Sequence, residues 1–141
     1  MRGATAVLML LAGAAWLGYT DEQFNADLDY AQVTYVHAVR AADGVWRFDA
    51  TVRHADTGWD HYADAWQIVE PEGGEVIAER VLLHPHVKEQ PFTRSLTGVD
   101  IPRGLRTVRI RAKCNVHGFG GRELLVELTP GQRERYAVEI R

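Results

Sequence analysis

The sequence predicts an all-β fold, a single antiparallel β-sandwich. Three observations lead to this prediction. Short segments alternate apolar and polar residues, which is the period of a strand with one buried face. Turn sequences rich in Gly and Pro separate these segments, and no stretch shows helical periodicity. With 141 residues, of which 46% are hydrophobic and 25% charged, the chain suits one globular domain.

The first half of the domain contains four predicted strands, over residues 32–40, 45–54, 62–69 and 75–83. Asp43-Gly44, between the first two, is a strong hairpin signal. The second strand alternates most clearly, with charged and polar residues on one face only. Its other face, which we expect to be buried, carries Trp46, Phe48, Ala50 and Val52.

The second half contains four more predicted strands. The fifth covers residues 91–98, and Pro102-Arg103-Gly104 turns into the sixth. Thr129-Pro130-Gly131 separates the seventh from the eighth, which ends the chain. Seven or eight such strands are typical of a sandwich. The inward residues of the last three strands are Val108, Ile110 and Ala112, then Leu124, Val126 and Leu128, then Tyr136, Val138 and Ile140.

Trp66 on the third strand indicates the type of sandwich. Immunoglobulin-like domains bury a tryptophan at this place in the strand series. The single cysteine, Cys114, excludes the intrachain disulfide of antibody domains. We therefore expect an immunoglobulin-like or fibronectin III-like sandwich over residues 31–141.

The N-terminus has the pattern of an export signal. Arg2 precedes an apolar run that ends in Ala12-Gly13-Ala14, a small-residue cleavage site. We expect a signal peptide over residues 1–15 and a linker over 16–30, which makes the protein periplasmic or extracellular. The alternative is a short membrane anchor over residues 4–19, and any membrane contact would come through this segment alone. The formal net charge of −3 and the absence of a basic run argue against nucleic acid binding.

Strand direction brings three loops to one end of the sandwich. If successive strands alternate direction, the loops at 54–61, 84–90 and 114–121 share an end, here called the histidine pole. Five of the six histidines lie in these loops. His37 is the exception, and its mid-strand position indicates a structural role.

The histidine pole predicts a transition-metal site, because imidazole is the commonest protein metal ligand. In His84-Pro85-His86 the proline favours extended backbone, which directs both imidazoles to one side. Two further loop histidines complete the site, and a thiolate alongside them would favour copper or zinc. The predicted ligands are His84, His86, His61 and His117.

For several other polar residues near the pole, the sequence allows either a structural role or a role at the metal site. His54 and Cys114 continue the inward alternation of their strands, so they are either buried structural residues or additional ligands. Asp60 or Asp64 could orient a metal-bound imidazole. Arg94 also has inward parity and needs a partner, so we expect an ion pair with Asp64 or Asp60.

The sequence leaves three functions open. The first is a non-catalytic exported metal-binding protein. The second is a module in which the aromatic and histidine side chains of the same loops bind a protein of the cell envelope. The third is an enzyme that uses histidine and aspartate for acid–base chemistry, although no nucleophile motif accompanies them.

Overall fold

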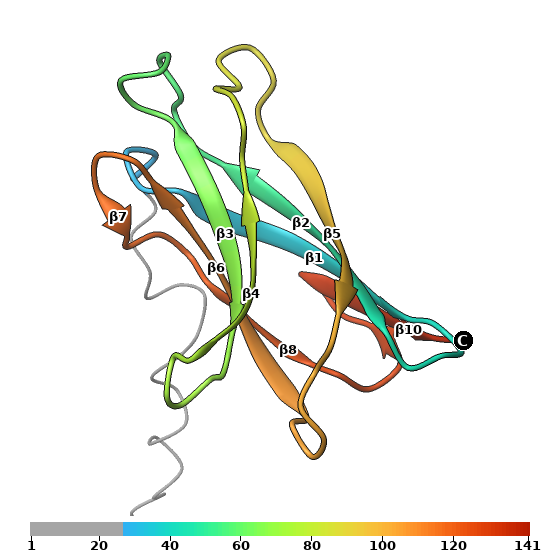
Figure 1. The fold of residues 1–141 in the computed structure, drawn as a ribbon. Helices are drawn as coiled ribbons and strands as arrows, with labels where there is room; N and C mark the ends of the chain where they lie inside the picture. The colour runs from blue at the N-terminus through green and yellow to red at the C-terminus, as the bar shows by residue number, and fades with distance from the viewer. Residues whose placement is uncertain (1–26) are drawn as a thin grey trace, which may run out of the picture.

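The computed structural model describes residues 27–141, which form a two-sheet fold of strands (Figure 1). The predicted signal peptide and residues 16–26 of the predicted linker lie outside this range. None of the described residues belongs to a helix long and apolar enough to cross a membrane. The strands are β1 (Gln32–Arg40), β2 (Trp46–Arg53), β3 (Ala63–Val69), β4 (Val76–Val81), β5 (Phe92–Val99), β6 (Thr107–Cys114), β7 (Gly118–Phe119), β8 (Leu124–Glu127), β9 (Gly131–Gln132) and β10 (Tyr136–Ile140).

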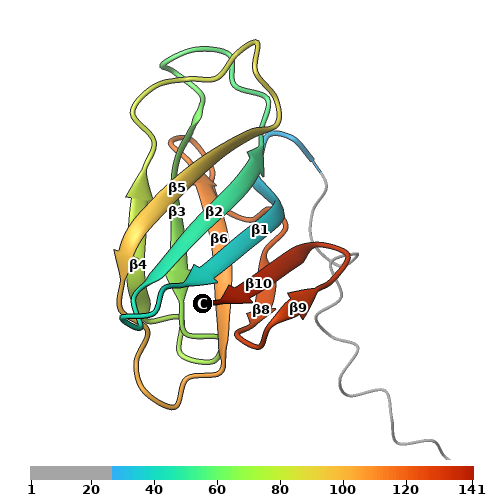
Figure 2. The ribbon, with the colours of Figure 1, turned by 90° about the vertical axis from the view of Figure 1, so that its right-hand side faces the viewer.

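The strands form two sheets packed face to face. One sheet has the order β5-β2-β1-β10-β9. The other has the order β4-β3-β6-β7, and β8 also pairs with β6. In Figure 2 the strands of the first sheet cross obliquely in front of those of the second. All eight predicted strands are present, which confirms the all-β prediction and the two-sheet architecture.

One pairing differs from the prediction of a wholly antiparallel fold. β1 and β10 pair in parallel, with Val36 opposite Tyr136 and Arg40 opposite Ile140. Alternation along a strand shows which residues are buried, but it does not show which strand lies alongside. The last strand therefore could not be placed from the sequence. The immunoglobulin-like or fibronectin III-like type stays a prediction.

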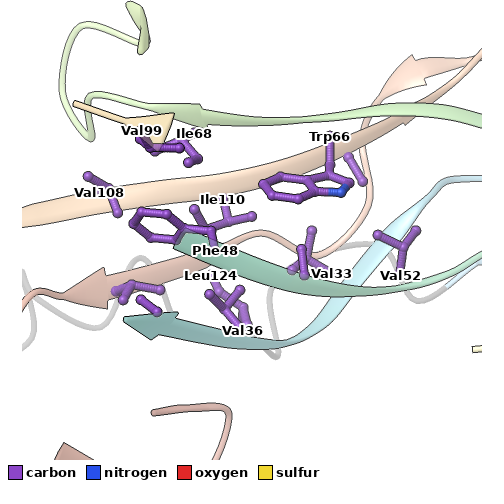
Figure 3. Close-up of a cluster of buried hydrophobic side chains, with 14 of the residues drawn as sticks. Val33, Val36, Phe48, Val52, Trp66, Ile68, Val99, Val108, Ile110 and Leu124 are labelled. Atoms are coloured by element: carbon purple, nitrogen blue, oxygen red, sulfur yellow. The ribbon is translucent and has the colours of Figure 1, made fainter. Parts of the chain in front are cut away.

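The core lies between the sheets and follows the predicted alternation. Every second residue of β2 is buried, beginning with Trp46, and Phe48 is fully buried. Trp66 of β3 faces it from the other sheet and is also fully buried (Figure 3). Burying side chains of this size contributes about 1.5–3 kcal/mol each. These contacts fix the strands whose ends carry the polar residues described below.

The three predicted loops do meet at one end of the fold. The β2–β3 and β4–β5 loops lie together at the top of both ribbon views (Figures 1 and 2). Asn115, at the end of β6, accepts a hydrogen bond from the Tyr62 backbone N–H at 2.9 Å and donates to the Trp59 carbonyl at 3.0 Å. The His86 backbone N–H donates to Asp56 Oδ2 at 2.7 Å. The histidine pole is thus one surface.

A segment before β1 also joins the histidine pole. Gly120 and Gly121 let it approach, because a Cβ on Gly121 would lie 2.0 Å from the Ala31 carbonyl oxygen. A Cβ on Gly120 would lie 2.4 Å from the Tyr30 ring. The glycines are needed here for close backbone packing. This packing places residues 27–30 of the predicted linker, together with Ala31, against the β7–β8 loop.

Candidate metal centre

Three side chains of metal-ligand type converge at the histidine pole. His54 follows β2, Cys114 ends β6, and His61 lies in the tight turn closed by the Gly58–His61 bridge. One ligand atom from each lies within 4.8 Å of the other two. His54 and Cys114 are buried, at 1% exposure each, while His61 is half-buried.

The backbone carbonyl oxygen of Asp29 lies among these three side chains. It is 3.1 Å from His54 Nε2, 3.3 Å from His61 Nε2 and 3.5 Å from Cys114 Sγ. The sulfur is 3.6 Å from His61 Nε2. A tetrahedral zinc ion with ordinary bond lengths holds its N, O and S ligand atoms about 3.3–3.7 Å apart. These four distances match four of the six edges of one coordination tetrahedron.

The Asp29 carbonyl oxygen cannot accept hydrogen bonds from all three neighbouring side chains at once. A carbonyl oxygen has two lone pairs, and each N–H or S–H donor needs one. Three potential donors, from His54, His61 and Cys114, face the Asp29 oxygen. A cation in their midst would turn all three into ligands and would bind the carbonyl as well.

Asp56 holds the imidazole of His54 in place. Its Oδ1 atom is 2.5 Å from His54 Nδ1, which leaves Nε2 directed at the Asp29 oxygen. A carboxylate on the far nitrogen is the usual partner of a metal-bound histidine. Burial raises the pKa of Asp56, but hydrogen bonds from His54 and from the backbone N–H groups of His86 and Ala63, together with the His54 charge, hold that pKa below its ordinary value. Asp56 is therefore a buried carboxylate.

His117 lies at the edge of this cluster. Its backbone N–H donates to Cys114 Sγ at 3.1 Å. Its exposed ring packs against His61, with ring centroids 5.1 Å apart, and against Tyr30, at 5.3 Å. Gly118 follows with a φ of 66°, the left-handed turn that brings the chain back into β7.

His84 and His86 form a separate pair on the other side of Asp56. Their ring centroids are 4.4 Å apart. In the described part of the chain, no ring contact or side-chain hydrogen bond joins this pair to His61 or His117. The structure thus divides the four predicted ligands into two groups, because the buried Asp56 lies between the β4–β5 loop and the His54 ring.

The ring of His86 is already engaged by other residues. Arg94 donates to its Nε2 atom at 2.7 Å, and Phe92 stacks on it with ring centroids 3.8 Å apart. Because a guanidinium only donates, His86 is neutral with its free lone pair on Nε2. Burial and the charges of Arg94 and His84 hold the pKa of His86 below its ordinary value, which agrees with a neutral His86 ring.

The expected ion pair of Arg94 with Asp64 or Asp60 is wrong. Arg94 contacts His86 instead, and both oxygens of Asp64 accept hydrogen bonds from Lys113 Nζ at 2.8 Å. The pairing of β3 with β6 shifts register between Ala63 and Ala65, so the alternation used to place Asp64 breaks at that residue. Asp60 is exposed. Its backbone carbonyl accepts a hydrogen bond from Asn115.

Two residues central to the cluster were missed from the sequence. Asp56 was given no role in the loop at 54–61, although it has the same parity as His54 and continues the inward face. Asp29 contributes a backbone atom, and no side-chain pattern reports on a carbonyl. His54 and Cys114 were correctly placed as buried, but the structure makes them the centre of the cluster.

No family model matches the chain. A protein named "Putative lipoprotein" from Halomicrobium mukohataei is 36% identical over 113 residues, which are 79% of this chain and 55% of that protein. The chain thus spans about half the length of this curated relative. A solved structure of a variant of the superoxide reductase neelaredoxin from Archaeoglobus fulgidus, in its reduced form, is 16% identical, with a TM-score of 0.43 over 78% of this chain and 100% of that one. A likeness of this size supports no inference.

Proposed function

We propose that the protein is an exported transition-metal-binding protein whose ligands are His54, His61 and Cys114. The Asp29 carbonyl is the fourth ligand, and the adjacent imidazole of His117 is the nearest candidate for a further one. The observation that carries the proposal is the convergence of two imidazole nitrogens and one sulfur on a single carbonyl oxygen, at 3.1, 3.3 and 3.5 Å.

The types of ligand limit which metal ions the site would bind. One thiolate with two imidazoles suits copper or zinc, and a carbonyl oxygen is a known weak axial ligand in copper sites of this composition. The role is binding, for delivery, storage or sensing of the ion. Residues His84 and His86 remain a predicted alternative ligand pair.

The test is metal content and titration of the purified full chain. We expect one equivalent of copper or zinc per chain by mass spectrometric metal analysis. Cys114→Ser and His61→Ala should each weaken binding at least tenfold. His37→Ala is the matched control, because His37 lies mid-strand and contacts Glu139 and Asp49. Equal binding by the parent, Cys114→Ser and His61→Ala would refute the proposal.

A second pair of variants separates this site from the one expected from the sequence. His84→Ala/His86→Ala should keep full metal binding if the ligands are His54, His61 and Cys114. Loss of metal in that double variant, with binding retained in Cys114→Ser, would instead support the His84–His86 pair. One equivalent of iron in the parent would support the proposed ligands but would show that copper or zinc is the wrong metal.

The proposed location is outside the cytoplasm. The relative from Halomicrobium mukohataei is named as a lipoprotein, and we propose that this chain is likewise exported. N-terminal sequencing of the exported protein should begin near Ala15 if the predicted signal is cleaved. Retention of Met1 would favour the membrane anchor.

A docking role for the histidine pole is the second candidate function. Four large apolar side chains of its loops are exposed, at 65% for Trp59, 73% for Leu83, 53% for Val87 and 55% for Val116. Such a patch is typical of a protein contact. A photo-crosslinker at position 59 should capture one defined envelope partner, while one at the exposed Val76 should not. Indistinguishable patterns from the two positions would reject this role.

A further inference from the structure

A cleft lies at the end of the sandwich opposite the histidine pole. It is bounded by the β1–β2 turn, by the β5–β6 loop that projects at the bottom of Figure 1, and by the residues that follow β8. Its volume is about 470 Å³, within the range of small-molecule sites. The metal ligands proposed above do not contribute to it.

The charged residues that line this cleft are all positive. Arg40, Arg103 and Arg106 line it, and no acidic residue is among the described residues of its lining. Within residues 27–141 none of the three guanidinium groups forms an ion pair or donates a side-chain hydrogen bond. Several other arginines of the fold are engaged, as with Arg109 on Glu123 and Arg80 on the Ser95 carbonyl. Three uncommitted guanidinium groups around one hollow form a site for an anion.

The remaining lining of the cleft is apolar. Trp46 is only 5% exposed, and Ile101, Leu105 and Leu128 are partly buried around it. The indole N–H of Trp46 donates to no group in the described part of the chain, and it is not among the atoms sealed from solvent. A buried indole usually finds a partner for this hydrogen. The cleft thus combines an apolar surface, one free N–H donor and three cationic groups.

We propose that this cleft binds a small organic anion, a carboxylate or phosphate monoester attached to a flat apolar body. The guanidinium groups would bind the anionic head bidentately. The apolar body would pack on Trp46 and Leu105, and an acceptor atom of the ligand would take the indole N–H. The site is independent of the proposed metal centre.

The test uses phenyl phosphate as the probe and nuclear magnetic resonance of the tryptophan indole N–H groups as the readout. Saturable movement of the Trp46 signal, with the exposed Trp59 signal at the opposite pole unchanged, is the expected result. Arg103→Gln/Arg106→Gln should weaken binding at least tenfold. Arg53→Gln, at the other end of β2, is the control and should bind like the parent.

Two partial probes test the two halves of the proposal. Inorganic phosphate carries only the head and benzyl alcohol only the body, so each should bind at least tenfold more weakly than phenyl phosphate. If inorganic phosphate binds as tightly as phenyl phosphate, the proposal that the ligand has an apolar organic body is wrong. An unmoved Trp46 signal, or full affinity in the Arg103→Gln/Arg106→Gln variant, would overturn the site. Cys114→Ser should bind phenyl phosphate like the parent, which separates this test from that of the metal centre.

Discussion

Removal of the Asp56 carboxylate is expected to destabilise the fold more than any other change to a loop residue of the histidine pole. Asp56 is 6% exposed and accepts three hydrogen bonds, from His54 Nδ1 and from the backbone N–H groups of Ala63 and His86. Asp56→Ala leaves these donors buried without an acceptor. The loop from β4 to β5 also loses its link to the loop from β2 to β3.

The magnitude follows from these contacts. A hydrogen bond to a charged group contributes about 1.5–3 kcal/mol, and a buried donor left unpaired costs about 1–3 kcal/mol. Relaxation and entry of water reduce the sum, so the loss in free energy of unfolding should be about 3–5 kcal/mol, as for other broken buried pairs. In a domain of this size, that loss lowers Tm by roughly 10–20 °C.

The assay is denaturant unfolding of the parent and the variant, both freed of metal by a chelator, with tryptophan fluorescence as the signal. Metal-free conditions separate the effect on the fold from any effect on metal binding. Asp60→Ala is the matched control, because Asp60 lies exposed in the same loop, and its effect should stay within about 0.5 kcal/mol. A loss below about 1 kcal/mol for Asp56→Ala would show that water replaces these hydrogen bonds and that the reasoning is wrong.

Three further changes test other parts of the fold. Phe48→Ala removes a fully buried ring from the core and should cost about 3–5 kcal/mol in denaturant unfolding; a cost below about 2 kcal/mol would contradict tight packing. Gly121→Ala places a Cβ against the Ala31 carbonyl, so it should cost about 1–3 kcal/mol and weaken metal binding at least tenfold, whereas Gly73→Ala, whose Cβ would make only an ordinary contact with Glu70 Oε2 at 3.8 Å, should do neither. Burial raises the pKa of Glu123, so its charge becomes unfavourable to folding as pH rises through that pKa. Glu123→Gln should therefore be at least as stable as the parent at pH 7 and lose that advantage at acidic pH; a marked loss at pH 7 would show that the ion pair with Arg109 outweighs burial.

The strands that alternate most clearly, such as β2, β6 and β8, were predictable because each has one buried face. The alternation from Trp46 to Val52 is set by the contact of that face with the other sheet, so the residue pattern alone locates β2 within a residue at each end. The same pattern places Trp66 in the core. The parallel partner of β1 was not predictable, since the contacts that select β10 are made by chain segments about a hundred residues apart.

The location of the candidate site at one end of the fold was predictable, but the residues that form it were not. Alternating strand directions brought the correct loops to one end. Which histidines meet there depends on how each loop folds, and that is decided by Asp56, which binds the His54 ring on one side and the His86 backbone on the other. His84-Pro85-His86 is visible in three consecutive residues, whereas the cluster of His54, His61 and Cys114 joins the β2–β3 loop to the end of β6, which is distant in the sequence.

The segment before β1 links this cluster to the rest of the fold. The Asp29 carbonyl reaches the three ligand side chains because its neighbours are fixed: the Ala55 N–H donates to the Leu28 carbonyl at 2.9 Å, and Gly121 allows Ala31 to pack closely. On the proposed function, a bound ion would join this segment to the ends of β2 and β6. A ligand that binds only the folded state stabilises it by an amount that grows with the logarithm of the ratio of its free concentration to Kd. Metal binding would therefore secure residues 27–31 on the sandwich, so that the N-terminal segment and the metal centre form one structural unit.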